Sequence, residues 1–180
     1  MLLGKNMTKL EEAIIYLLSR EKNSKMAILR LAKYLYLADY LYAKSFGNKQ
    51  TFTGGYLRYS KGPVPNNFYN AIEKLKKENI RRDGNIITLT RGVRQFSLNN
   101  KEKACLDKIV TDFSDISLTK TVNISYNTEP MLEIRKLEKA IGDELPYENI
   151  NFNSIKPHSL MNEETKQDKA EFDKYLKENE

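Results

Sequence analysis

The chain has 180 residues, 40% of them hydrophobic and 10% aromatic, which is enough for one packed domain and excludes a wholly disordered chain. Its net charge is +6, and its single cysteine and single histidine exclude an internal disulfide and a cysteine zinc site and leave little material for histidine chemistry. No apolar run approaches the ~20 residues that cross a bilayer, and the start of the chain lacks the apolar stretch of a signal peptide, so we expect a cytoplasmic protein.

The charge is unevenly distributed along the chain. Residues 49–103 contain twelve Lys or Arg and four acidic residues, whereas residues 161–180 contain four lysines and seven acidic residues. The basic middle suits an anionic partner surface, and a solvated lysine-rich face is the alternative interpretation.

Two helices are predicted at the N-terminal end. Thr8 and Glu11 form a capping box in front of an amphipathic stretch, which predicts a first helix ending near residues 22–23. The second helix, over about residues 25–45, is apolar on nearly all sides, so we expect it to be the buried centre of the fold. Four tyrosines are interleaved in it and are expected to lie in the core with hydrated hydroxyls: Tyr34, Tyr36, Tyr40 and Tyr42.

Asp39 is the one carboxylate in the apolar context of that central helix. A buried acid needs hydrogen-bond donors, a cation or a raised pKa. The structural interpretation is that Asp39 accepts hydrogen bonds from backbone amides or pairs with a basic residue such as Arg58. A catalytic role is the alternative, although the sequence offers no partner for it.

The next segment is predicted to contain a strand and a rigid turn. Residues 51–59 alternate aromatic and polar side chains and indicate a short strand. Residues 60–66 contain Gly62, Pro63 and Pro65, which favour a turn without regular structure. Because Gly62 permits a conformation that a side chain would strain, we expect Gly62→Val to destabilise the fold before it affects any partner.

A winged-helix-like element is predicted after this turn. Phe68, Ile72 and Leu75 form the apolar stripe of a helix with a basic opposite face. Asp83 and Gly84 then favour a hairpin between residues 80–82 and 86–89.

The C-terminal half is predicted to be helical and to end in a charged tail. We expect a helix over about residues 100–113 that buries Cys105, at most one short helix within residues 114–128, and a helix over 129–141 that stops at Gly142. Residues 1–157 are predicted to form one compact domain, followed by an acidic tail over 158–180. The fold class is α+β and mostly α, around a buried central helix with a small β-sheet or hairpin.

The sequence contains no motif for nucleotide phosphates and no nucleophile elbow. Cys105 is expected to be a buried structural thiol, and His158 an exposed loop residue. We therefore predict no catalytic residue, no metal site, no cofactor and no enzymatic activity.

Three segments occur together in order: residues 33–39 (KYLYLAD), residues 57–65 (LRYSKGPVP) and residues 87–92 (ITLTRG). Their combination resembles the Panacea domain of SocA-like antitoxins and of proteins associated with phages and mobile elements. About residues 25–92 contain the match, and a weaker similarity continues through residues 124–130. Tyr126 stands where family members often have a histidine, and Met131 stands at the place of a tryptophan.

The resemblance implies a mostly helical antitoxin that neutralises a cognate toxin by direct protein contact, or that delivers the toxin to a host protease as an adaptor. It also implies that the toxin is encoded next to this protein. The motif residues are expected to be structural or partner-binding: Tyr36, Asp39, Arg58, Tyr59, Lys61, Gly62, Pro63 and Val64.

A winged-helix DNA-binding regulator is the alternative function, with nucleic acid as a secondary partner. Its phosphate contacts would be Lys74, Lys76, Lys77, Arg81, Arg82, Arg91 and Arg94. The lysine-rich helix that contains Phe68, Ile72 and Leu75 lacks the Asn, Gln and Arg cluster expected of a base-reading face. For the antitoxin function, toxin binding is expected to suffer from charge reversals within Arg58, Lys61, Arg81 and Arg82, or from deletion of the tail after Asn162, depending on which surface the toxin uses.

Overall fold

The structure is a computed structural model that describes residues 7–47 and 49–155. Its α-helices are α1 (Lys9–Arg20), α2 (Ile28–Phe46), α3 (Phe68–Leu75), α4 (Asn100–Phe113), α5 (Leu118–Tyr126) and α6 (Glu129–Ile141). Its strands are β1 (Lys25–Ala27), β2 (Tyr56–Tyr59), β3 (Gly62–Pro65), β4 (Ile80–Asp83) and β5 (Ile86–Leu89), and short 3-10 turns lie at Lys22–Ser24 and Phe152–Ser154. The predicted fold class, α+β and mostly α, is confirmed.

Local capping interactions set several helix boundaries. The Thr8 hydroxyl accepts from the amide of Glu11 and the Glu11 carboxylate accepts from the amide of Thr8, so the predicted capping box of α1 is confirmed. Helix α4 begins with the same arrangement of Asn99 and Glu102. Helix α6 ends at Gly142, which has the left-handed φ of +82° that favours glycine.

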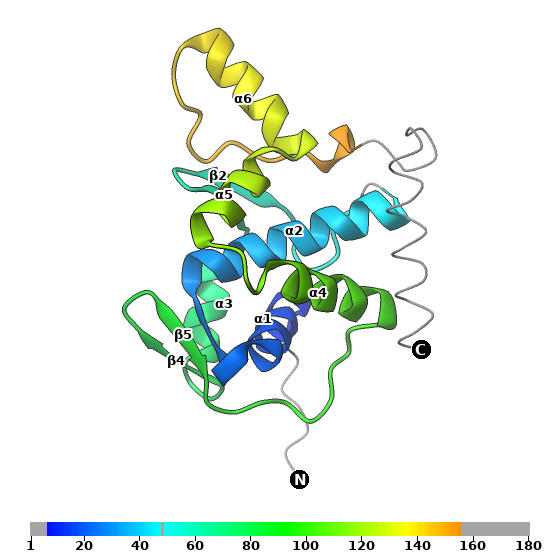
Figure 1. Cartoon of the computed structure of the whole chain (residues 1–180), viewed down its shortest axis with the longest axis vertical. Coiled ribbons are helices and arrows are strands. Elements are labelled where there is room, and N and C mark those ends of the chain that lie inside the picture. Colours follow the sequence, from blue (N-terminus) through cyan, green and yellow to red (C-terminus); the bar gives the residue numbers. More distant parts are fainter. Residues whose placement is uncertain (1–6, 48, 156–180) are drawn as a thin grey trace.

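Helix α2 is the centre of the fold, as its all-round apolar pattern predicts. It runs between α4 on one side and α5 with the β2–β3 hairpin on the other (Figure 1). Leu31, Leu35 and Ala38 are fully buried, and each leucine contributes roughly 1.5–3 kcal/mol through burial. Tyr34 and Tyr36 are also fully buried, whereas Tyr40 and Tyr42 are half-buried at the end of the helix.

Three predicted boundaries are wrong. Residues 25–27 do not belong to the central helix; they form strand β1, which pairs with β5 and places Met26 in the core. Residues 62–65 are not an irregular turn; they form strand β3, which pairs with β2. The strand predicted over 51–59 is shorter, because it begins at Tyr56.

The prolines of β3 occupy the positions where a strand tolerates them. Val64 and Gly62 stand opposite Leu57 and Tyr59 in the same alternation that gives the hydrogen bond from the Asn66 amide to the Gly55 carbonyl. Pro63 and Pro65 therefore take the alternate positions, at which a backbone N–H would point away from β2.

The strands form two sheets. The three-stranded antiparallel sheet has the order β1-β5-β4. Strand β1 thus adds a third strand to the predicted β4–β5 hairpin, which follows α3 in the winged-helix-like element. The second sheet contains β2 and β3 and is extended by residues 147–150, which run along the free edge of β2.

No helix within the described ranges has both the length and the apolar character needed to span a membrane. The acidic tail and His158 lie outside the described residues, so the structure does not test the predictions made for them.

Candidate functional site

Asp39 fastens the segment after α2 to the helix. Its side chain is fully buried, and its Oδ1 accepts hydrogen bonds from the amides of Thr51 and Phe52 at 2.5 and 3.1 Å. The Tyr56 hydroxyl donates to Oδ2 at 2.6 Å. Of the two structural interpretations from the sequence, the structure shows the one with backbone amides. Burial raises the pKa of Asp39 to about 7, although these three donors favour the charged form.

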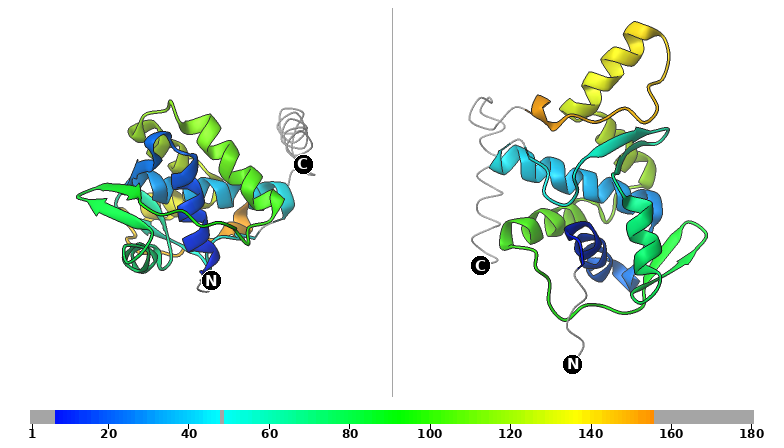
Figure 2. Two further views of the ribbon diagram at one scale, coloured as in Figure 1. Left: turned by 90° about the horizontal axis from the view of Figure 1, so that it is seen from below. Right: turned by 180° about the vertical axis from the view of Figure 1, so that it is seen from behind.

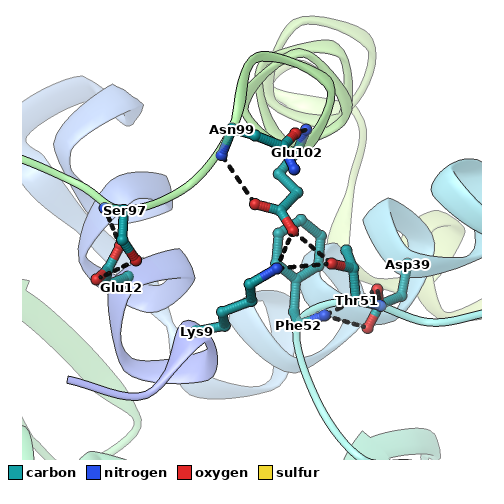
Figure 3. Close-up of polar contacts among 8 residues, drawn as sticks. All are labelled: Lys9, Glu12, Asp39, Thr51, Phe52, Ser97, Asn99 and Glu102. Carbon is teal, nitrogen blue, oxygen red and sulfur yellow. Dashed lines mark hydrogen bonds and ion pairs between the residues drawn. The ribbon is translucent and has the colours of Figure 1, made fainter. Parts of the chain in front are cut away.

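A second polar cluster adjoins Asp39 and joins α1 to α4 (Figure 3). The buried Glu102 carboxylate accepts hydrogen bonds from the Lys9 ammonium, the Thr51 hydroxyl and the Asn99 amide. Burial raises the pKa of Glu102, but these donors outweigh it and leave the pKa below its ordinary value. Thr51 therefore contacts two buried acids, through its amide and its hydroxyl.

Arg58 is buried and holds the C-terminal end of α6. Its Nε lies 2.8 Å from Glu138 and its Nη1 lies 3.5 Å from Glu144. Nη1 also donates to the carbonyl of Tyr59 at 3.0 Å. A charge reversal at Arg58 would place three carboxylates close together and destabilise the fold. Loss of partner binding in that variant would therefore reflect a damaged fold and not a lost contact with the partner.

Lys33 is a fully buried lysine within the motif that the sequence analysis did not single out. Its ammonium donates to the carbonyl of Pro63 at 2.6 Å and so ties α2 to β3. Burial lowers the pKa of Lys33 to about 7. The neighbouring Gly62 has φ +91°, and a Cβ there would lie 3.4 Å from the Lys33 Nζ and 3.2 Å from the Tyr126 ring.

We expect the stability of the wild-type protein to rise with pH, relative to Lys33→Met, between pH 7 and pH 10.5. In that range the unfolded chain holds a proton on Lys33 that the folded chain does not, because the pKa falls from 10.5 to about 7 on folding. The stability is fully present above pH 10.5 and is lost as the pH falls to 7, with a limiting slope of about 1.4 kcal/mol per pH unit.

Urea unfolding of both proteins at pH 7, 8 and 9 measures this difference. Lys120→Met, which removes an exposed lysine, is the control and should show no such slope. A constant difference between wild type and Lys33→Met over this range would contradict a buried amine that loses its proton on folding.

The other motif residues divide into buried and exposed ones. The Tyr36 hydroxyl shares a 2.6 Å hydrogen bond with Thr128, and its ring contacts Tyr56 edge-on at 5.1 Å. Pro63 and Val64 are buried in β3. By contrast, Lys61 is exposed between β2 and β3, and Tyr59 is half-buried beside it.

Tyr59 belongs to a surface cluster that we call the tyrosine face: Tyr59, Tyr69 and Tyr147. The Tyr59 ring lies 5.1 Å from Tyr147 and 6.4 Å from Tyr69, measured between centroids. Tyr69 is 47% exposed and Tyr147 is 64% exposed. Three large aromatic side chains from β2, α3 and the segment after α6 thus gather on one surface, where Tyr69 and Tyr147 are exposed and Tyr59 is half-buried.

The backbone holds Tyr147 in an unusual conformation. Its φ of +64° lies in the left-handed region that non-glycine residues seldom adopt. The Tyr147 amide donates to the carbonyl of Arg58 at 2.7 Å, and the Arg58 amide donates to the carbonyl of Glu148 at 2.9 Å. Pairing with β2 therefore maintains a conformation that exposes this ring, and such strain gathers at binding sites.

The basic residues predicted for phosphate contact are exposed but are not equally available. Lys74 pairs with Glu11 at 2.8 Å, and Lys76 pairs with Glu73 at 2.9 Å. Arg82 donates to the carbonyl of Gly84, while Lys77, Arg91 and Arg94 are exposed on the connections around the hairpin.

The sequence does not point to Tyr69 and Tyr147 as site residues. Nothing in their local sequence marks them, because residues 59, 69 and 147 meet only in the folded chain.

In the described part of the chain, no group of three or more His, Cys, Asp or Glu residues is placed to hold a metal ion. Cys105 is buried, as predicted, and burial raises the pKa of its thiol.

A family model described as antitoxin SocA-like, Panacea domain, matches residues 31–130, which is more than half of the chain. The chain therefore belongs to the SocA-like Panacea antitoxin family. No curated protein and no solved structure gives a significant match. The matched segment includes Lys33, Asp39, Arg58 and Tyr69 and ends before Tyr147 and most of α6.

Proposed function

We propose that this protein neutralises a toxin protein by binding it directly, and that the tyrosine face is the contact surface. Membership in an antitoxin family is the observation that carries the antitoxin role. The exposed rings of Tyr69 and Tyr147 support the contact surface, because tyrosine is enriched at the hot spots of protein interfaces.

The burial of the other motif residues also supports the tyrosine face as the contact surface. Asp39, Arg58 and Lys33 bind other parts of this chain, so they stabilise the scaffold and leave the exposed rings for a partner. Lys61 is exposed next to Tyr59 and adds a positive charge at the rim of the face. The proposed activity is stoichiometric occlusion of the toxin and requires no turnover.

We expect the double variant Tyr69→Ala/Tyr147→Ala to lose neutralisation while it keeps wild-type thermal stability. Truncating hot-spot side chains typically costs about 2 kcal/mol or more, which raises Kd at least about 30-fold. The assay is growth on co-expression with the product of the adjacent gene, followed by co-purification of the two proteins. Ile86→Ala removes another exposed apolar side chain, 42% exposed and on β5, and should behave as wild type.

Two outcomes would contradict this proposal. Full neutralisation by the double variant would show that the tyrosine face is not the contact surface. Neutralisation accompanied by loss of the toxin from the cell would favour the alternative mechanism, in which this protein is an adaptor that delivers the toxin to a host protease.

A further inference from the structure

The solvent face of the three-stranded sheet has two cationic side chains in one row, with a threonine between them. Lys25 stands opposite Thr88, and Thr88 stands opposite Arg81, so these three side chains lie on the same face of β1, β5 and β4. In the neighbouring row, Met26 and Ile87 stand opposite each other on the other face and are buried, whereas Arg82 at the end of that row is exposed. Lys25 and Arg81 are exposed and Thr88 is half-buried.

We propose that this sheet face binds the phosphate backbone of double-stranded DNA, with Lys25 and Arg81 as the principal contacts. Phosphate groups attract lysine and arginine without regard to base sequence, and Thr88 adds a hydroxyl donor between the two cations. The activity is separate from toxin neutralisation, since it uses a different surface and requires no toxin.

The shape of the element favours a duplex over a smaller anion. The β4–β5 hairpin projects beyond the helices in each of the views (Figures 1 and 2). With strands about 4.8 Å apart, the backbones at Lys25 and Arg81 lie roughly 10 Å apart, so their side chains can reach separate phosphates.

The acidic residues around the row oppose this binding only weakly. Arg81 pairs with Asp83 at 3.1 Å, but both side chains are about two-thirds exposed, so a phosphate can replace the carboxylate at little cost. Lys74 and Lys76 are held by Glu11 and Glu73 and are not part of the proposed contact. The proposed surface is therefore narrower than the seven basic residues that the sequence suggested, and it adds Lys25.

The test is fluorescence anisotropy of the purified full chain with a labelled 20-base-pair DNA duplex at several salt concentrations. We expect Lys25→Ala/Arg81→Ala to weaken binding at least about tenfold at 0.1 M salt and to reduce the slope of log K against log salt by about 2. Arg135→Ala/Lys136→Ala removes the same residue types from the exposed surface of α6 and should bind as wild type.

Asp83→Asn keeps the test independent of folding defects. Removing the carboxylate beside Arg81 should tighten DNA binding more than Asp115→Asn, which makes the same change of charge at an exposed position outside the sheet, so the difference between the two variants reports on this face. The proposal would be overturned if the wild-type protein did not bind the duplex, or if Lys25→Ala/Arg81→Ala and Asp83→Asn both bound it with wild-type affinity. Equal affinity of the wild-type protein for the duplex and for polyglutamate of matched charge would also overturn it. Tyr69→Ala/Tyr147→Ala should retain DNA binding, so failure of this inference is distinguishable from failure of the antitoxin proposal.

Discussion

Asp39→Ala is expected to destabilise the protein by about 2–5 kcal/mol, because it leaves buried donors without an acceptor. The amides of Thr51 and Phe52 would lose their shared partner, while the Tyr56 hydroxyl could turn to the carbonyl of Leu35 at 3.0 Å. Asp39→Asn keeps one oxygen for the two amides and should lose clearly less. Urea unfolding at pH 7 measures both variants, with exposed Asp115→Ala as the control.

The pH dependence distinguishes this interpretation from a simple loss of packing. Since the pKa of Asp39 is raised from 3.8 to about 7, the folded chain holds a proton that the unfolded chain has released in that range. The stabilisation from the raised pKa is fully present below pH 3.8 and is lost as the pH rises to about 7. The advantage of wild type over Asp39→Asn should therefore shrink from pH 4 to pH 7. A constant advantage would show that Asp39 stays charged throughout.

Gly62→Val is expected to be the second large effect, at about 2–4 kcal/mol of lost stability. A β-branched residue is strained at φ +91°, and its Cβ would lie 3.2 Å from the Tyr126 ring and 3.3 Å from the Ser125 hydroxyl oxygen. Both obstacles belong to α5, so the variant should separate the β2–β3 hairpin from α2 and α5.

Variants at two other glycines separate the two causes of this lost stability, which are backbone strain at a positive φ and the steric contact of the new side chain. Gly84 has φ +57° but open space around it, and Gly54 has open space and no left-handed φ. Alanine at Gly84 therefore measures the conformational strain alone, and alanine at Gly54 measures neither effect. Gly62→Ala should be the least stable of the three in thermal unfolding. If Gly62→Val retained wild-type stability and lost only partner binding, the start of β3 would belong to the interface instead of the scaffold.

These two experiments also test the division between scaffold and surface on which the antitoxin proposal rests. The buried residues of the family motif hold parts of this chain together: Asp39 and Lys33 join α2 to the segments that follow it, and Arg58 joins β2 to the end of α6. Variants there should reduce stability and neutralisation together. Variants at Tyr69 and Tyr147 should reduce neutralisation alone, and those at Lys25 and Arg81 should reduce DNA binding alone.

The sequence alone was sufficient for the parts of the fold that local interactions specify. Thr8 and Glu11 predict the start of α1, and Gly142 predicts the end of α6, because each acts on a turn of its own helix. The apolar pattern of α2 likewise identifies the buried centre, since a helix without a polar face must be covered on all sides. The hydrogen bonds of Asp39 were foreseeable as a type, because a buried acid requires donors, although the sequence did not say which donors.

Only the tertiary structure decided the features that depend on distant segments. Residues 25–27 have a helical pattern but form a strand, because pairing with residues 86–88 outweighs a weak local preference. Pro63 and Pro65 suggested a turn, yet the alternation of hydrogen-bonded pairs along β2 leaves room for both in a strand. The tyrosine face and the row from Lys25 to Arg81 each join three segments, and spacing along a chain does not specify which segments become neighbours when the core closes.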